Sequence, residues 1–164
     1  MDSVRAPRTH NKSDWKRTDW VTDFVAAISN DKYFRWFDSG DVYSVKLAWK
    51  IYQVMAATPN CQHWLPTRMY KFAKFAKVFE AMENLSNVVV RYSSDSIHGG
   101  LIDGECTSTI VPHADSETTG TICEAYARKG KCADCRACWD KEVSVIAYPQ
   151  HGRKMAKVAI KLAS

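Results

Sequence analysis

Four of the six cysteines in this 164-residue chain lie close together, at a spacing that suits metal ligation. They are Cys123, Cys132, Cys135 and Cys138, and the last three form a CxxCxxC run. Two residues between thiols let successive sulfurs turn towards one centre. Disulfides are the competing interpretation, but Met1–Arg5 is too polar for a secretory signal. The pattern therefore favours a metal or cluster site.

The grouping of these thiols favours a [4Fe–4S] cluster over zinc, which stays the alternative. Structural zinc usually takes its ligands as two separated CxxC pairs. Here three thiols form one run and the fourth lies upstream, which is closer to the ferredoxin arrangement. The spacing is not the CxxxCxxC of radical S-adenosylmethionine enzymes. With all four thiols as ligands no iron stays open, so a cluster would transfer electrons or hold structure.

A centre with four thiolate ligands carries excess negative charge, and the sequence around it is rich in cations. Positive side chains and backbone N–H groups nearby can offset such charge and tune a reduction potential. We expect Trp139 to cover the site as a hydrophobic lid and His151 to lie near it without being a ligand. The alternative for each cation is that it is simply a solvated surface residue. The cations are Arg128, Lys129, Lys131 and Arg136.

Composition limits the class of protein. Hydrophobic residues make up 46% of the chain, which excludes a disordered protein. No apolar run approaches the roughly 20 residues that span a bilayer, so we expect a soluble cytosolic protein with reduced cysteines. A net charge of +5, from 23 basic and 18 acidic residues, is compatible with nucleic-acid binding without requiring it.

Strand-like and helix-like segments alternate along the chain, which predicts a parallel α/β sheet. A closed eight-fold barrel typically needs about 250 residues, so we expect one α/β domain over 1–164 with a partial, open, TIM-barrel-like sheet. Residues 1–12 would be an arm, and residues 120–142 a cysteine-rich loop. Asp41 would cap the second helix. Strands are predicted at about 33–37, 63–65, 87–92, 106–111 and 143–148. Helices are predicted from about 13 or 18 to 29 and at about 42–57, 70–84 and 151–163.

Polar residues recur at or just past the ends of the predicted strands, where parallel α/β sheets bind their ligands. We call these positions the rim candidates. Each has a structural alternative as a helix cap or turn residue, and the charged ones can form a salt-bridge network instead of a pocket. The rim candidates are Asp38, Ser39, Asp41, Thr67, Arg68, Arg91, Ser93, Ser94 and Asp95.

Two further catalytic patterns are weak. Cys61 lies near His63 but is better interpreted as a loop or strand-start thiol than as a nucleophile. Gly99-Gly100 lacks the GxxxxGK[ST] pattern of a phosphate-binding loop. Neither pattern competes with the cysteine run as the centre of the chemistry.

Four blocks in this order resemble an uncharacterised family of tailed-phage proteins, named after mycobacteriophage gene product eighty-eight. The blocks are Phe34–Asp41, Trp64–Arg68, Asn87–Asp95 and Cys132–Trp139. The resemblance covers about residues 4–155. It implies a phage-encoded protein of the host bacterial cytoplasm, with an iron–sulfur cluster and no assigned activity.

These observations lead to two hypotheses from different classes. The first is a phage-encoded iron–sulfur protein, either a redox module or a cluster-dependent enzyme of unknown substrate, with a host protein or redox partner and no membrane association. The second is a zinc-stabilised module whose basic loop binds nucleic acid or a host protein. Neither hypothesis names a reaction.

Overall fold

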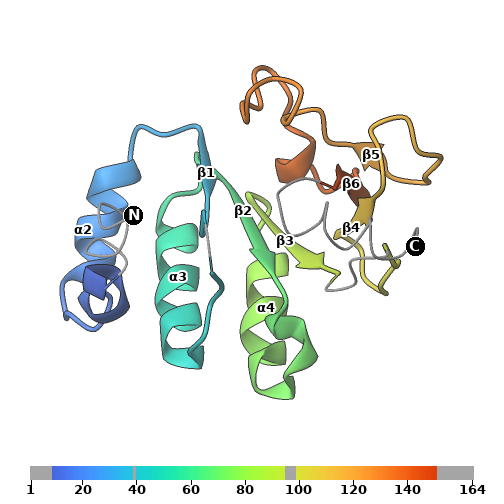
Figure 1. The fold of residues 1–164 in the computed structure, drawn as a ribbon. Coiled ribbons are helices and arrows are strands. Elements are labelled where there is room, and N and C mark those ends of the chain that lie inside the picture. The colour runs from blue at the N-terminus through green and yellow to red at the C-terminus, as the bar shows by residue number, and fades with distance from the viewer. Residues whose placement is uncertain (1–8, 39, 95–98, 151–164) are drawn as a thin grey trace. The chain divides into compact units, whose positions relative to one another are not determined.

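The computed structural model describes residues 9–38, 40–94 and 99–150, which fall into two compact units (Figure 1). The helical unit comprises the described residues up to Leu65, together with Met69–Val90. The cysteine unit comprises Pro66–Arg68 and the described residues from Arg91 onwards. The expectation of a single domain stays a prediction, and the helix expected at 151–163 lies outside the described residues.

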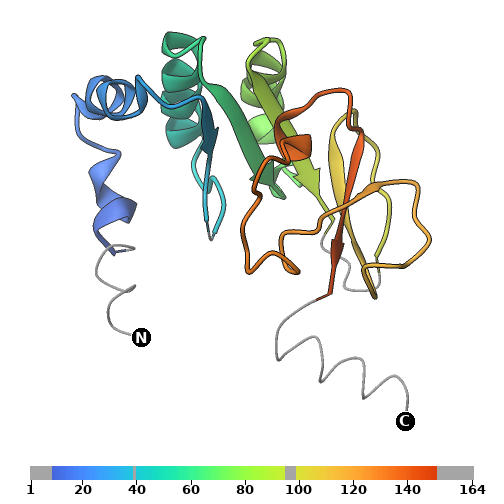
Figure 2. The same cartoon turned by 90° about the horizontal axis from the view of Figure 1, so that it is seen from above.

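Three helices of the helical unit lie on one side of its strands β1 and β2 (Figure 2). Helix α3 contacts both α2 and α4. The strands form because short β-branched and aromatic runs alternate with longer segments of helical periodicity. The bounds are α2 Trp20–Ile28, β1 Tyr33–Arg35, α3 Val45–Ala57, β2 Gln62–Thr67, α4 Ala76–Glu83 and β3 Val88–Ser93.

The apolar stripe predicted for the first helix is confirmed as the packing face of α2. Trp20 and Ile28 are buried, and Phe24 stacks on Trp36 with ring centroids 5.0 Å apart. Residues 9–14 are helical as well, so a helix covers the described end of the expected arm, residues 9–12.

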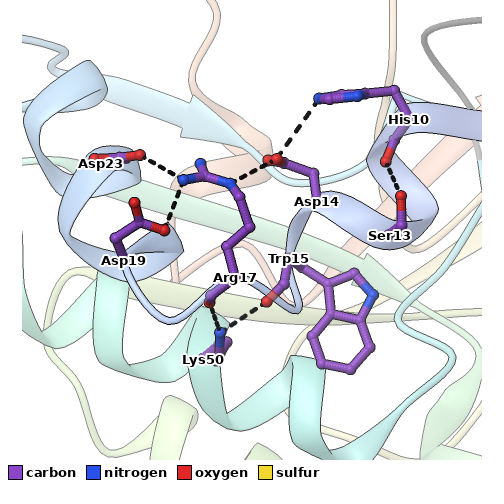
Figure 3. A network of polar contacts seen from close by, with 8 residues as sticks. All are labelled: His10, Ser13, Asp14, Trp15, Arg17, Asp19, Asp23 and Lys50. Carbon is purple, nitrogen blue, oxygen red and sulfur yellow. Dashed lines mark hydrogen bonds and ion pairs between the residues drawn. The ribbon is translucent and has the colours of Figure 1, made fainter.

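Aspartates gather around one arginine between this first helical segment and α2 (Figure 3). Arg17 bonds the carboxylates of Asp14 at 2.8 Å, Asp19 at 2.7 Å and Asp23 at 2.9 Å. Lys50 of α3 donates to the carbonyl oxygen of Trp15 at 2.8 Å, which ties the segment to the helical core. These pairs are exposed, so their contribution to stability is small.

Helix α3 begins three residues later than predicted, and the expected cap is wrong. The carboxylate of Asp41 accepts the N–H of Val42 at 2.7 Å, and the N-cap position belongs to Ser44. Asp41 therefore closes the turn before the helix. The buried face of α3 contains the apolar residues of the predicted period: Leu47, Ala48, Ile51, Val54 and Met55.

The long helix predicted for 70–84 is divided. Two 3-10 turns, η1 (Met69–Lys71) and η2 (Ala73–Phe75), precede α4, and Phe72 between them is extended. Phe75 is buried and stacks on Phe79 at 5.5 Å. Strand β2 also extends through the expected turn at Pro66 and ends at Thr67.

A buried histidine links the strands to the end of α3. The indole N–H of Trp36 donates to Nδ1 of His63 at 3.3 Å, so Nε2 carries the ring proton. Nε2 lies 2.8 Å from Oγ1 of Thr58, and that hydroxyl donates to the carbonyl of Val54. Burial lowers the pKa of His63 to about 4. These contacts leave His63 unavailable to activate Cys61 as a nucleophile.

Strands β3 and β4 to β6 pair in parallel in the cysteine unit. Their bounds are β4 Thr107–Val111, β5 Thr121–Ile122 and β6 Val145–Pro149, and β4 pairs with β6 along its whole length. The short strand β5, which the sequence did not indicate, pairs with β6. Gly120 permits this approach, because a Cβ there would lie 2.8 Å from Cγ1 of Val145.

The strand order confirms an α/β fold with an open parallel sheet. The order is β1-β2-β3 and then β3-β4-β6-β5. Except for the short strand β5, neighbouring strands in the sheet follow one another in the sequence. A doubly wound sheet would reverse direction at a switch point. Sequential parallel strands are the topology of a TIM-barrel segment, as expected.

The buried His63 predicts a pH dependence of stability. Its pKa is about 6.5 in the unfolded chain and about 4 in the fold, so the unfolded chain binds the extra proton between these values. The free energy of unfolding should therefore be unaffected by this group above pH 6.5. It should fall as the pH is lowered from 6.5 through 4, by about 3 kcal/mol in total.

Urea unfolding at pH 4 to 7 measures this effect. His63→Gln has no such titration, so its stability should change less over this range than that of the wild type. Equal pH profiles for the two proteins would contradict the assignment of a neutral, buried His63.

Candidate metal centre

The cysteine loop, residues 120–142, contains β5 and leads towards β6 (Figure 1). Two of its cysteines contact β6. The N–H of Cys123 donates to the carbonyl of Ala147 at 2.8 Å. Cys138 is buried in a 3-10 turn, η3 (Ala137–Trp139), with its Sγ 3.4 Å from the hydroxyl of Tyr148. The two outer cysteines of the pattern are thus positioned by one strand.

The two middle cysteines lie in a tight turn. The N–H of Cys135 donates to the carbonyl of Cys132 at 3.0 Å, and Ala133 between them has a left-handed φ of 47°. A left-handed alanine costs of the order of 1 kcal/mol and is often found at functional sites. Cys135 is exposed and Cys132 half-buried.

The four thiols interact electrostatically with one another. Burial raises the pKa of Cys123, and the charges of Cys132 and Cys135 raise it further. Burial likewise raises the pKa of Cys138 to about 11, with added repulsion from Cys123 and Cys132. Four thiolates in this loop are therefore unfavourable unless a positive charge compensates them.

All six cysteines are free thiols, and their present distances do not form a ligand shell. Over the part of the chain that the structure describes, no group of three or more His, Cys, Asp or Glu side chains is arranged to hold a metal ion. The donor chemistry of the four thiols nevertheless fits a thiolate-bound metal.

Arg91, one of the rim candidates, holds this loop from inside the sheet. It is the fourth residue of β3, as the predicted strand at 87–92 implied, and it is 0% exposed. Its Nη1 donates to the carbonyls of Thr107 at 3.0 Å and Val143 at 2.9 Å. Three longer bonds of 3.2–3.3 Å join Nη1 to Ser144 and Nη2 to Ala137 and Asp140.

The charge of Arg91 has no carboxylate partner in the described residues, and its Nε is buried without a hydrogen-bond acceptor. A buried cation normally requires a counter-charge. The positive charge of Arg91 acts instead on Cys138 and Tyr148. It lowers the pKa of both groups, whereas burial, the larger effect, raises them. Sequence reasoning missed Tyr148, because a tyrosine at the end of a strand carries no signal of contact with a thiol.

Two of the predicted cations are engaged by the cysteine loop itself. Arg128 pairs with Glu124 and donates to the carbonyl of Cys132 at 3.3 Å. Arg136 donates to the carbonyls of Ala133 at 2.6 Å and Cys135 at 2.7 Å. They surround the Cys132–Cys135 turn with positive charge. Trp139 is half-buried in η3, and His151 lies outside the described residues.

The remaining rim candidates differ widely in their surroundings. The side chain of Asp38 is 99% exposed and lies 3.9 Å from Arg35. Thr67 is the buried last residue of β2, and Arg68 follows it at the surface.

The candidates after the third predicted strand contact β4. Ser93 accepts a 3.3 Å hydrogen bond from Ser108, and Ser94 bonds the same residue through its backbone N–H. Ser39 and Asp95 lie outside the described residues. Convergence of the rim candidates stays a prediction.

Fold and loop together define an α/β protein with an open parallel sheet and a cysteine-rich loop held by a buried arginine. The chain belongs to the family described as Gene product 88, which matches residues 1–141. This confirms the family resemblance. No curated protein and no solved structure matches the chain. None of the helices in the described ranges is long and apolar enough to cross a membrane.

Arg91→Met should destabilise the cysteine unit. The substitution keeps an apolar stem but removes the guanidinium that bonds five carbonyl groups, at a cost of roughly 3 kcal/mol. Arg35→Met is the matched control, because Arg35 is 45% exposed in its side chain and its ion pair is long. It loses a cation–π contact with Trp64, 4.8 Å from the ring centroid, so its effect should stay within about 1 kcal/mol.

Urea unfolding gives the stability of both variants, and hydrogen exchange locates the change. Residues 137–144 should lose protection in Arg91→Met. Equal stability of the two variants would show that the carbonyl contacts of Arg91 do not hold the loop.

Proposed function

We propose that Cys123, Cys132, Cys135 and Cys138 hold a metal centre, and that this centre is a [4Fe–4S] cluster in preference to zinc. The observation that carries the proposal is the buried Arg91, which has no counter-carboxylate among the described residues and whose charge acts on Cys138. An anionic centre at this position would supply the missing negative charge.

Both the loop and Arg91 require charge compensation, of opposite sign. Metal binding requires thiolates, and the burial and mutual repulsion of these thiols oppose thiolate formation. Arg91, Arg128 and Arg136 provide positive charge on the inner and outer sides of the loop. The unmet Nε–H of Arg91 offers a donor to a nearby sulfur, and hydrogen bonds to sulfur tune cluster potentials.

The arrangement of the loop suits two fixed and two adjustable ligands. Cys123 and Cys138 are attached to β6, whereas Cys132 and Cys135 lie in a turn closer to the surface. Trp139, next to Cys138, is positioned in sequence to limit water access.

A cluster held by four thiolates supplies one-electron transfer or structural support. We therefore infer a redox module or a cluster-dependent enzyme of unknown substrate, encoded by a phage and acting in the host cytoplasm. The protein's own residues bind the centre, exclude water from Cys138 and place cations beside it.

Anaerobic reconstitution with iron and sulfide tests this proposal. The protein should turn brown and retain roughly four irons per chain. Cys135→Ser removes a ligand and should lose most of the iron. Cys106→Ala is the matched control, because Cys106 is a buried thiol of the same unit outside the proposed ligand set, and it should retain the iron.

Metal analysis decides between the outcomes. A colourless protein that retains one zinc and no iron would replace the cluster with the zinc alternative. Full iron content in Cys135→Ser, or equal loss in Cys106→Ala, would contradict the four-cysteine assignment.

A further inference from the structure

The positive charge of this protein is concentrated in one part of the chain. From Val42 to Phe79 there is no aspartate or glutamate, and the segment contains six cations. Since the whole chain has a net charge of +5, the remaining residues together carry −1. The six cations are Lys46, Lys50, Arg68, Lys71, Lys74 and Lys77.

Three of these lysines gather in the divided segment before α4. Lys71 ends η1, Lys74 lies in η2, and Lys77 lies in the first turn of α4. Lys74 and Lys77 are three apart in consecutive helical turns, so they lie on neighbouring positions of one surface. Lys71 directly precedes the extended Phe72. All three lysines are exposed, whereas Phe75 between them is buried. Lys50 is engaged with backbone carbonyls near Arg17 instead.

An exposed aromatic ring lies within this row. Phe72 is 51% exposed, although the nearby Phe75 is fully buried. The ammonium group of Lys74 lies 5.8 Å from the centroid of the Phe72 ring. Lysines alone are commonly solvated surface residues, but solvation explains neither the exposed phenylalanine nor the absence of acids over this segment.

We propose that the lysine–phenylalanine surface, Lys71, Phe72, Lys74 and Lys77, binds single-stranded nucleic acid. Lysines neutralise backbone phosphates, and an exposed aromatic ring stacks on a base. A duplex hides the faces of its bases, so the ring favours a single strand. The basic residues of the cysteine loop are less suited, because Arg128 and Arg136 bond carbonyls of their own loop.

Fluorescence anisotropy with a labelled single-stranded oligonucleotide tests this surface directly. Neutralising three phosphates predicts a salt slope of about −2, or roughly 20-fold weaker binding at 200 mM than at 50 mM salt. Lys71→Gln/Lys74→Gln/Lys77→Gln should lose about tenfold or more in affinity at 50 mM salt and flatten the slope. Phe72→Leu should weaken binding about fivefold or more and leave the slope unchanged.

The matched control removes the same charge elsewhere in the helical unit. Lys12, Lys16 and Lys32 are exposed and lie outside the acid-free segment, so their triple replacement by glutamine should change affinity less than about threefold. Circular dichroism confirms that each variant is folded.

Four results would overturn the proposal. They are no binding at 50 mM salt, equal losses in the two triple variants, a duplex bound as tightly as the single strand, and loss of binding only on Lys129→Gln/Lys131→Gln in the cysteine loop. None of these results depends on the metal centre, so they leave the proposed cluster untouched.

Discussion

The structure of the cysteine unit depends on one buried guanidinium. Arg91 joins backbone carbonyls on β4, in η3 and in the residues that lead into β6, so one side chain fixes both ends of the segment that carries Cys138. The energetic difficulty is its charge. Carbonyl oxygens supply dipoles but no negative charge, and the described residues provide no carboxylate. A thiolate centre beside Arg91 would supply the negative charge that the arginine lacks. The arginine would in turn offset the repulsion between the buried thiolates.

Much of the fold could be predicted from the sequence, because its strands and helices have distinct periods. The continuous β-branched run before Arg91 predicted a strand buried on both faces, and β3 confirms it. Strand β5 could not be predicted, because two residues carry no period and their pairing depends on the small Gly120. The division before α4 was missed because Phe72 fits a helical stripe, yet its backbone is extended.

The candidate site was predicted in its residue types and less well in its geometry. The cysteine spacing predicts a metal-binding loop, and this stays a prediction. A sequence does not show that β6 positions Cys123 and Cys138. Arg91 was predicted near the end of a strand, and the structure places it within β3. Its five carbonyl partners, which lie far away in the sequence, could not be predicted. Contacts separated by about 16 to 53 positions leave no local pattern.

X-ray absorption at the metal edge of the anaerobically reconstituted protein tests the central claim most directly. The account predicts a first shell made only of sulfur, with a second shell of iron that distinguishes a cubane from a single zinc ion bound at about 2.3 Å. Nitrogen or oxygen atoms in the first shell, or a protein that retains no metal, would contradict a centre held by these four cysteines.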